Sequence, residues 1–160
     1  MVKEISLNDK LPSFSLDATL VNMCGDSDLL GHWSVLFIYP KNNTSGCTRE
    51  AREFNERCTE FESAGLRIFG VSKDTMASHT SFSKKLNLQF PLISDPQTQL
   101  IQSLNAWKEK SMYGKKYMGA ERSTFLVDKD LTIKYIWRKV KVAGHVNEVF
   151  DKYQELVRNH

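Results

Sequence analysis

The sequence has few cysteines, and they do not form the patterns that usually build structure. Only three occur among 160 residues, Cys24, Cys47 and Cys58. Their odd number argues against a disulfide framework and indicates a reducing compartment. No Cys-x-x-Cys pair is present, and the four histidines are not clustered with the cysteines. We therefore expect free thiols, no structural metal site and no cofactor.

Long apolar segments are also missing. No window approaches the roughly 18 apolar residues that a membrane-spanning helix requires. The first residues, Met1 to Ile5, include a lysine and a glutamate, and they lack the apolar core of a secretory signal and the arginine-rich pattern of a transit peptide. These absences predict a soluble cytoplasmic protein without a membrane partner.

The excess of positive charge is small. The 22 lysines and arginines exceed the 19 acidic residues by a net charge of +3, and the densest basic stretch covers only residues 138–141. That stretch is too short for a nucleic-acid footprint, so we expect no nucleic-acid partner. The hydrophobic fraction of 41% is ordinary for a domain with a core. No repeat or linker divides the chain, and one globular domain is expected over residues 1–160.

Alternating strand and helix patterns predict a mixed sheet with helices on both faces. Strands or extended segments are expected at 33–39, 66–72, 90–94, 123–127 and 131–137. Helices are expected at 76–86, 96–104 and 145–158, and from Cys47 until Gly65 stops the pattern, whereas 108–121 is predicted as a loop and 22–26 as a turn. This order is compatible with a thioredoxin-like fold, although periodicity alone does not separate it from other α/β arrangements.

Cys47 lies where a polar loop after a buried strand turns into a helix. The free N–H groups of a first helical turn and the positive end of the helix dipole stabilise a thiolate. Thr44 and Ser45 are typical N-cap residues, and Pro40 ends the strand where it can shield the pocket from water. These features suit a cysteine nucleophile. A buried structural cysteine is the alternative, and the local pattern does not choose between them.

The segment from Pro40 to Cys47, PKNNTSGC, resembles the P-x-x-x-T-x-x-C motif of peroxiredoxins. Along the whole chain the sequence is similar to the peroxiredoxin Q branch, also called bacterioferritin comigratory protein. The matching segments are FIYPK (37–41), GCTREA (46–51), GVSKD (70–74), SH (78–79), FPLISD (90–95), MYGK (112–115), ERSTFL (121–126) and VAGH (142–145). The resemblance implies a thioredoxin-like α/β fold with a central mixed sheet and an N-terminal extension, and a thiol-dependent peroxidase.

The same resemblance implies the roles of the reacting groups. Cys47 would be the peroxidatic cysteine, which attacks the O–O bond and becomes a sulfenic acid. Thr44 would hydrogen-bond the peroxide, and the backbone N–H groups of Gly46 and Cys47 would bind its oxygens. Arg122 matches the active-site arginine, whose permanent charge would serve the thiolate and the transition state. Pro40 belongs to the same motif.

Two further residues match family positions. Glu50 matches an acidic position at the start of the helix and could hold an arginine in place near the substrate. A carboxylate that simply stabilises the first helical turn is the alternative for Glu50. His79 also matches a family position, and we expect it to be a structural or helix-polar residue rather than a general base.

The sequence departs from the family where a second, resolving cysteine is common. The two usual positions hold Arg52 and Ser83. Cys58 has the spacing of a core residue and lies eleven residues beyond Cys47, about 16 Å along one helix, whereas a disulfide needs Cα atoms within about 7 Å. Cys24 is not excluded by sequence. We therefore expect a one-cysteine cycle in which an external thiol, thioredoxin or glutathione with glutaredoxin, reduces Cys47.

Several alternatives remain at this point. A disulfide oxidoreductase would want a Cys-x-x-Cys pair, and a papain-like hydrolase would want a recognisable cysteine-flanking sequence; neither is present. A peroxide sensor or holdase-like protein that uses oxidised Cys47 as a switch is a competing function. The substrate is expected to be hydrogen peroxide or an alkyl hydroperoxide. Because the branch is often monomeric and sometimes dimeric, we expect a monomer or weak dimer.

Overall fold

The computed structural model describes residues 4–159, and its centre is a seven-stranded mixed sheet in the order β2-β1-β5-β4-β3-β8-β9. Strands β3, β4 and β5 run parallel, whereas β8 runs antiparallel to β3 and β9 to β8. The strand bounds are β1 (Ser15–Ala18), β2 (Asn22–Gly25), β3 (Trp33–Ile38), β4 (Leu66–Ser72), β5 (Leu92–Ser94), β8 (Ser123–Val127) and β9 (Ile133–Trp137).

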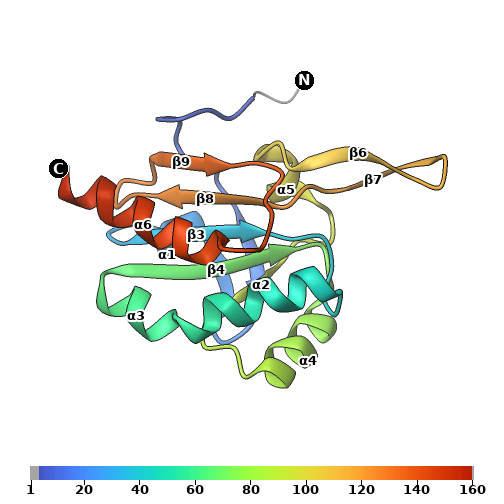
Figure 1. Ribbon diagram of the computed structural model, residues 1–160, viewed down its shortest axis with the longest axis horizontal. Coiled ribbons are helices and arrows are strands. Elements are labelled where there is room, and N and C mark those ends of the chain that lie inside the picture. Colours follow the sequence, from blue (N-terminus) through green and yellow to red (C-terminus); the bar gives the residue numbers. More distant parts are fainter. Residues whose placement is uncertain (1–3, 160) are drawn as a thin grey trace.

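Helices cover both faces of this sheet (Figure 1). One face carries α2 (Ser45–Glu56), α3 (Cys58–Ser63), α4 (Met76–Leu86) and α6 (His145–Arg158). The other face carries the short helices α1 (Asp26–Leu29) and α5 (Gln99–Ser103). The α/β prediction of a central mixed sheet flanked by helices is thus confirmed.

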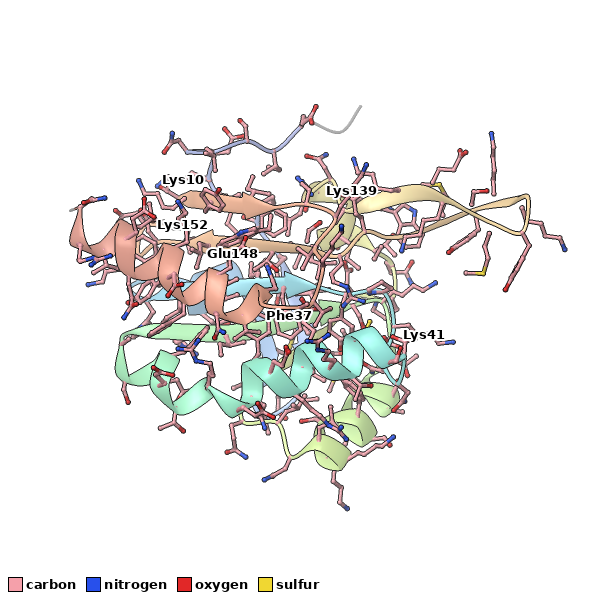
Figure 2. The ribbon with its side chains drawn as sticks, in the orientation of Figure 1. Lys10, Phe37, Lys41, Lys139, Glu148 and Lys152 are labelled. Carbon is pink, nitrogen blue, oxygen red and sulfur yellow. The ribbon has the colours of Figure 1, made fainter. Side chains whose placement is uncertain are left out.

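Strand β3 shows why the chain builds two cores. Every residue of β3 is buried, and successive side chains of a strand point to opposite faces. Val35 and Phe37 enter the core beneath α2, where Phe37 (labelled in Figure 2) stacks on Phe54 with ring centroids 4.6 Å apart. Leu36 and Ile38 enter the core beneath α1 and α5. The sheet therefore separates two apolar compartments.

Most predicted elements are confirmed, with strand and helix ends within a few residues of the expected bounds. The expected strand at 66–72, the strand at 123–127 and the helices at 76–86 and 145–158 coincide with β4, β8, α4 and α6. The short extended segment near residue 92 and the helix near residue 100 are also present, as β5 and α5.

The predicted continuous helix between Cys47 and Gly65 is wrong, because α2 ends at Glu56 and α3 begins at Cys58. The residue between them, Arg57, departs from helical geometry at φ −107° and ψ 8°. Its guanidinium lies over the ring of Phe150 in α6, 4.8 Å from the ring centroid. This tertiary contact accompanies the break. The predicted stop at Gly65 is confirmed by its left-handed conformation, with φ +90°.

The loop predicted over 108–121 is also wrong. Strands β6 (Trp107–Met112) and β7 (Lys115–Ala120) form an antiparallel hairpin, which we call the β6–β7 arm. Tyr113 and Gly114 make its turn with φ of +53° and +78°, as a type I′ turn requires. The arm projects away from the rest of the molecule (Figure 1). Most of its side chains are exposed, so the apolar alternation that marks a buried strand is missing.

The predicted turn at 22–26 is corrected too. Cys24 lies in β2, directly opposite Leu16 in β1, and is buried. Strands β1 and β2 form an N-terminal hairpin that joins the sheet beside β5, so the expected N-terminal extension is part of the sheet. Within residues 4–159, no helix has the length and apolar character needed to cross a membrane.

Candidate active site

Cys47 lies in the first turn of α2, immediately after the loop that follows β3. Thr44 occupies the N-cap position with extended backbone angles, φ −81° and ψ 153°. The first hydrogen bond of the helix runs from the N–H of Thr48 to the carbonyl of Thr44, 2.9 Å long. The N–H groups of Gly46 and Cys47 precede that bond, at the positive end of the helix dipole. The predicted placement of Cys47 at a helix start is therefore correct.

Arg122 follows the β6–β7 arm in the chain, and its side chain contacts the thiol of Cys47. It lies between β7 and β8, and its Nη2 donates to Sγ of Cys47 over 3.3 Å. Its Nη1 donates to Oε1 of Glu50 over 2.7 Å. Burial by itself lowers the pKa of Arg122, but Glu50 and Cys47 outweigh that effect and raise it. The guanidinium is therefore a fixed positive charge beside the sulfur.

Glu50 is fully buried, although its position in the first turns of α2 could have placed it in solvent. Burial raises the pKa of its carboxyl from 4.5 to about 7, against the opposing effect of Arg122. Its Oε2 has no hydrogen-bond partner among the described residues. Of the two interpretations of Glu50, this geometry favours the one in which it holds the arginine.

Gly46 allows the guanidinium to approach the start of the helix. A Cβ atom at this position would lie 3.2 Å from Nη2 of Arg122, closer than ordinary van der Waals contact. Any larger residue would therefore displace Arg122 by a few tenths of an ångström. The absence of a side chain at Gly46 therefore leaves room for the guanidinium that donates to Cys47.

Thr44 and Pro40 lie in the loop that leads to Cys47. The hydroxyl of Thr44 donates to the carbonyl of Lys41 over 3.0 Å and does not cap the helix, so its oxygen lone pairs stay free to accept a hydrogen bond. Thr44 is exposed and Pro40 is half-buried at the beginning of the loop. The side chain of Lys41 points away from the molecule (Figure 2).

Asn42 fixes this loop to the body of the protein, and the sequence did not reveal it. Its amide oxygen accepts from the hydroxyl of Tyr39 over 2.6 Å, and its backbone N–H donates to Asp74 over 3.0 Å. Its Nδ2 lies 3.0 Å from both Oγ of Ser78 and Nδ1 of His79. Asn42 is 3% exposed, so these bonds form away from water. Three of its partners, Asp74, Ser78 and His79, lie in the segments at 70–74 and 78–79 that match the family. That match was the only sequence feature that pointed to this network.

His79 and His145 are both buried, and each makes its own polar contacts. The Nε2 of His79 lies 3.0 Å from the carbonyl of Ile93, and its Nδ1 faces the Asn42 amide, a pattern that suits a neutral ring. Burial lowers the pKa of His79. The Nε2 of His145 lies 2.8 Å from Oγ1 of Thr124, and burial lowers its pKa to about 4. The structural role expected for His79 agrees with this geometry.

The other two thiols lie away from the site described above. Cys24 belongs to the core on the opposite face of the sheet from Cys47, and burial raises its pKa to about 11. Cys58 is a core residue as predicted; its Sγ donates to Glu62 over 3.6 Å, and burial raises its pKa to about 12. All three cysteines are free. Neither of the other thiols has the environment of a reactive cysteine.

Known proteins resemble this chain over most of its length. Residues 7–136 match the AhpC/TSA family. Peroxiredoxin Bcp of Xanthomonas campestris is 44% identical over 144 residues, which are 88% of this chain and 90% of that protein. Peroxiredoxin Bcp of Bacillus subtilis is 39% identical over 152 residues, 95% of this chain and 97% of that protein.

Solved structures agree with the sequence comparisons. The bacterioferritin comigratory protein of X. campestris, described for its alkyl peroxide reduction, has a TM-score of 0.84 at 41% identity and covers 89% of this chain and 90% of its own. A mutant of PrxQ from Xylella fastidiosa has a TM-score of 0.91 at 36% identity, with 97% and 99% covered. These similarities confirm the resemblance and the thioredoxin-like fold. The chain therefore belongs to the AhpC/TSA family, as a peroxiredoxin of the Q or bacterioferritin comigratory branch, and is a thiol-dependent peroxidase.

Proposed function

We propose that Cys47 is the nucleophile of this peroxidase. Its thiolate attacks one oxygen of a peroxide, so that an S–O bond forms as the O–O bond breaks and Cys47 becomes a sulfenic acid. The other oxygen leaves as hydroxide or alkoxide and takes up a proton. The observation that carries this proposal is the hydrogen bond from Arg122 to Sγ of Cys47, because a fixed cation beside sulfur favours the thiolate.

The donors around the thiol suit the charge that develops during this step. Negative charge moves from sulfur to the peroxide oxygens, and preorganised donors aimed at those oxygens stabilise the transition state. The backbone N–H groups of Gly46 and Cys47 lie at the start of α2, before its first hydrogen bond. Arg122, 75 positions further along the chain, supplies a third donor group.

Thr44 binds the substrate in this proposal. Its hydroxyl already donates to the carbonyl of Lys41, so its oxygen accepts the hydrogen of the incoming peroxide. That direction of hydrogen bonding selects a hydroperoxide, which has a hydrogen to donate. Pro40 shields the pocket from water at the start of the same loop.

Glu50 acts through Arg122 as a positioning residue. Its carboxylate binds one nitrogen of the guanidinium and leaves the other directed at Cys47. A planar guanidinium held at two points has one orientation, which a lysine ammonium would lack. The pair is shielded, because the side chains of Arg122 and Glu50 are 16% and 0% exposed.

The catalytic cycle uses one cysteine per chain and an external thiol. The thiol condenses with the Cys47 sulfenic acid to a mixed disulfide and water, and a second thiol then releases Cys47. Thioredoxin, or glutathione with glutaredoxin, supplies these thiols. Two observations support the proposal: Arg52 and Ser83 occupy the usual resolving positions, and the sheet lies between the cores of Cys24 and Cys47.

Hydrogen peroxide and alkyl hydroperoxides are the proposed substrates. The mechanism requires only an O–O bond and one hydrogen on the peroxide, and the X. campestris relative is described as reducing alkyl peroxides. The chain would act as one peroxidase domain over residues 1–160, as a monomer or weak dimer.

A peroxide sensor is the second candidate. The observation in its favour is that Cys47 is 1% exposed, so its oxidised form must move before any thiol can reach it. Steady-state peroxide consumption with thioredoxin, glutaredoxin with glutathione, and dithiothreitol distinguishes the two functions. Turnover with at least one reductant, abolished in Cys47→Ser, supports the peroxidase cycle. Oxidation of Cys47 without turnover would favour the sensor, and a Cys47→Ser protein that still consumes peroxide would contradict both.

A further inference from the structure

The β6–β7 arm pairs with no other strand in residues 4–159. It is anchored at its base, where the N–H of Glu121 donates to the carbonyl of Ala106 over 2.6 Å and Lys73 lies over the ring of Trp107 at 5.6 Å. From there it extends into solvent with side chains on both surfaces (Figures 1 and 2). An isolated two-stranded hairpin gains little stability of its own, so its length calls for a functional reason.

The end of the arm exposes large apolar side chains. Tyr113 at the turn is 97% exposed, and Met112, Met118 and Tyr117 are 55%, 48% and 44% exposed. Tyrosine and methionine are enriched at protein–protein interfaces. Met112 and Tyr117 share one surface of the arm, whereas Met118 lies on the other. Their grouping at the end of a projecting element suits contact with another molecule better than the scattered exposure that is normal for a protein.

The arm also carries the net positive charge of the chain. It contains four lysines and one glutamate, a net charge of +3, which equals the net charge of all 160 residues. Strand alternation and register place Lys108, Lys110, Met112, Lys115 and Tyr117 on one surface of the arm, which we call its cationic face. The single acidic residue, Glu109, lies on the other surface and pairs with Lys116 over 3.6 Å.

The cationic face adjoins the active site. Lys110 belongs to it, is half-buried, and has a pKa lowered by burial and by the charge of Arg122, whereas Cys47 opposes the shift. Lys110 therefore lies close enough to Arg122 and Cys47 to feel their charges. The base of the arm continues directly into Glu121 and Arg122, so a partner that lies along this face toward the base approaches Cys47.

Three kinds of molecule are candidate partners for the cationic face, and they differ in how well they complement its charge and shape. A second copy of the chain has no excess negative charge to offer, because the residues outside the arm are balanced in charge. A small thiol such as glutathione needs a concave site, whereas the arm is a projecting hairpin. A protein with acidic and apolar residues around its reactive cysteine complements both properties of the arm.

We propose that the cationic face of the β6–β7 arm is the docking surface for the protein thiol that reduces Cys47, and that this partner presents an acidic and apolar surface around its own cysteine. This inference rests on the proposed one-cysteine cycle and names the class of its reductant. In the step that it assists, the partner's thiol condenses with the sulfenic acid to a mixed disulfide and water. A second thiol of the partner then forms its own disulfide and releases Cys47.

The arm offers a matched pair of variants. Lys115 and Lys116 are exposed neighbours on opposite surfaces, so Lys115→Glu and Lys116→Glu change the net charge equally while only Lys115→Glu alters the cationic face. The reductant is an acidic bacterial thioredoxin kept reduced by thioredoxin reductase and NADPH; glutaredoxin with glutathione is assayed in parallel. Dithiothreitol, which needs no docking surface, serves as the reference reductant.

We expect Lys115→Glu to lower kcat/KM for the protein reductant by roughly fivefold or more, mainly through KM, and Lys116→Glu to change it less than twofold. Both variants should match the wild type with dithiothreitol. Added salt should lower kcat/KM for thioredoxin more in the wild type than in Lys115→Glu. Equal effects of the two variants, or a loss that dithiothreitol shares, would overturn the inference.

Failure of this inference is distinguishable from failure of the proposed function. Trapping of the Cys47 sulfenic acid after one equivalent of peroxide tests the chemistry without any reductant. If that acid forms and dithiothreitol supports turnover, but neither protein reductant does, the docking surface is rejected and the peroxidase mechanism stands. If the acid never forms, the mechanism itself is wrong.

Discussion

Arg122 and Glu50 are joined by a hydrogen bond of 2.7 Å between Nη1 and Oε1, across 72 positions of sequence. The bond turns the other nitrogen of the guanidinium toward the sulfur of Cys47. The carboxylate is buried at a cost in desolvation, and the arginine beside it offsets part of that cost. In the proposed mechanism, the pair fixes a positive charge beside the reacting sulfur.

Arg122→Lys tests the geometry of that charge. The lysine keeps the charge but cannot bind Glu50 and Cys47 at two fixed points. We expect the rate constant for oxidation of Cys47 by hydrogen peroxide, measured by stopped-flow fluorescence, to fall by roughly 100-fold. Arg52→Lys, on the exposed side of α2, is the control and should react at the wild-type rate. A wild-type rate for Arg122→Lys would show that the two-point arrangement is dispensable.

Gly46→Ala tests the close approach of Arg122 to the start of α2. The added Cβ would displace the guanidinium by a few tenths of an ångström, which weakens its bond to Cys47. We expect oxidation of Cys47 to slow by roughly tenfold while the fold is retained. Ser45→Ala, one residue earlier and exposed, is the matched control. Equal rates for the two variants would contradict the account of Gly46.

Asn42→Ala tests the anchor of the active-site loop. It removes the side-chain bonds to Tyr39, Ser78 and His79 and leaves buried polar groups without partners. We expect the free energy of unfolding in urea to fall by about 1–3 kcal/mol and oxidation of Cys47 to slow. Lys41→Ala, whose side chain points into solvent, should change neither quantity. A stable variant with normal oxidation kinetics would rule out the anchor.

Glu50 also makes the stability depend on pH. The folded protein holds its proton more tightly than the unfolded chain, with a pKa of about 7 against 4.5. The stability from protonated Glu50 is therefore complete below about pH 4.5 and is lost as the pH rises through about 7. The loss is roughly 3 kcal/mol at most. In urea unfolding, Glu50→Gln should therefore gain stability relative to the wild type as the pH rises from about 4.5 to 7. A profile parallel to that of the wild type would exclude the effect.

His145 acts in the opposite direction over part of the same range. Its folded pKa of about 4 lies below the ordinary 6.5, so the unfolded chain binds a proton first as the pH falls. Stability associated with neutral His145 is present above about pH 6.5 and is lost as the pH falls through about 4. The two effects offset each other in the wild type. The double variant Glu50→Gln/His145→Gln should therefore be flatter than either single variant.

The sequence predicts best those elements whose apolar side chains form a continuous run or a regular pattern. The strand at 33–39 is a continuous apolar run because β3 is buried on both faces. The β6–β7 arm escaped prediction because solvent surrounds most of it and lysines replace the apolar pattern. At the break between α2 and α3, Arg57 contacts Phe150, which is far away in sequence, and no local pattern contains such a contact.

The sequence likewise predicts only part of the candidate site. Cys47, Thr44 and Gly46 are close in sequence, so a motif captures them together. The approach of Arg122 to Cys47 follows from the fold, and only the family resemblance pointed to it. The burial of Glu50 and the four partners of Asn42 are tertiary facts that no local pattern contains.

The central claim is that Cys47 is the only catalytic thiol of its chain, and mass spectrometry of the peroxide-treated wild type tests it most directly. One equivalent of peroxide is added with dimedone, and the protein is digested without reduction. We predict a dimedone adduct on Cys47, no disulfide to Cys24 or Cys58, and wild-type turnover with dithiothreitol in Cys24→Ala/Cys58→Ala. A stoichiometric disulfide between Cys47 and Cys24, or between Cys47 and Cys58, would contradict the one-cysteine cycle.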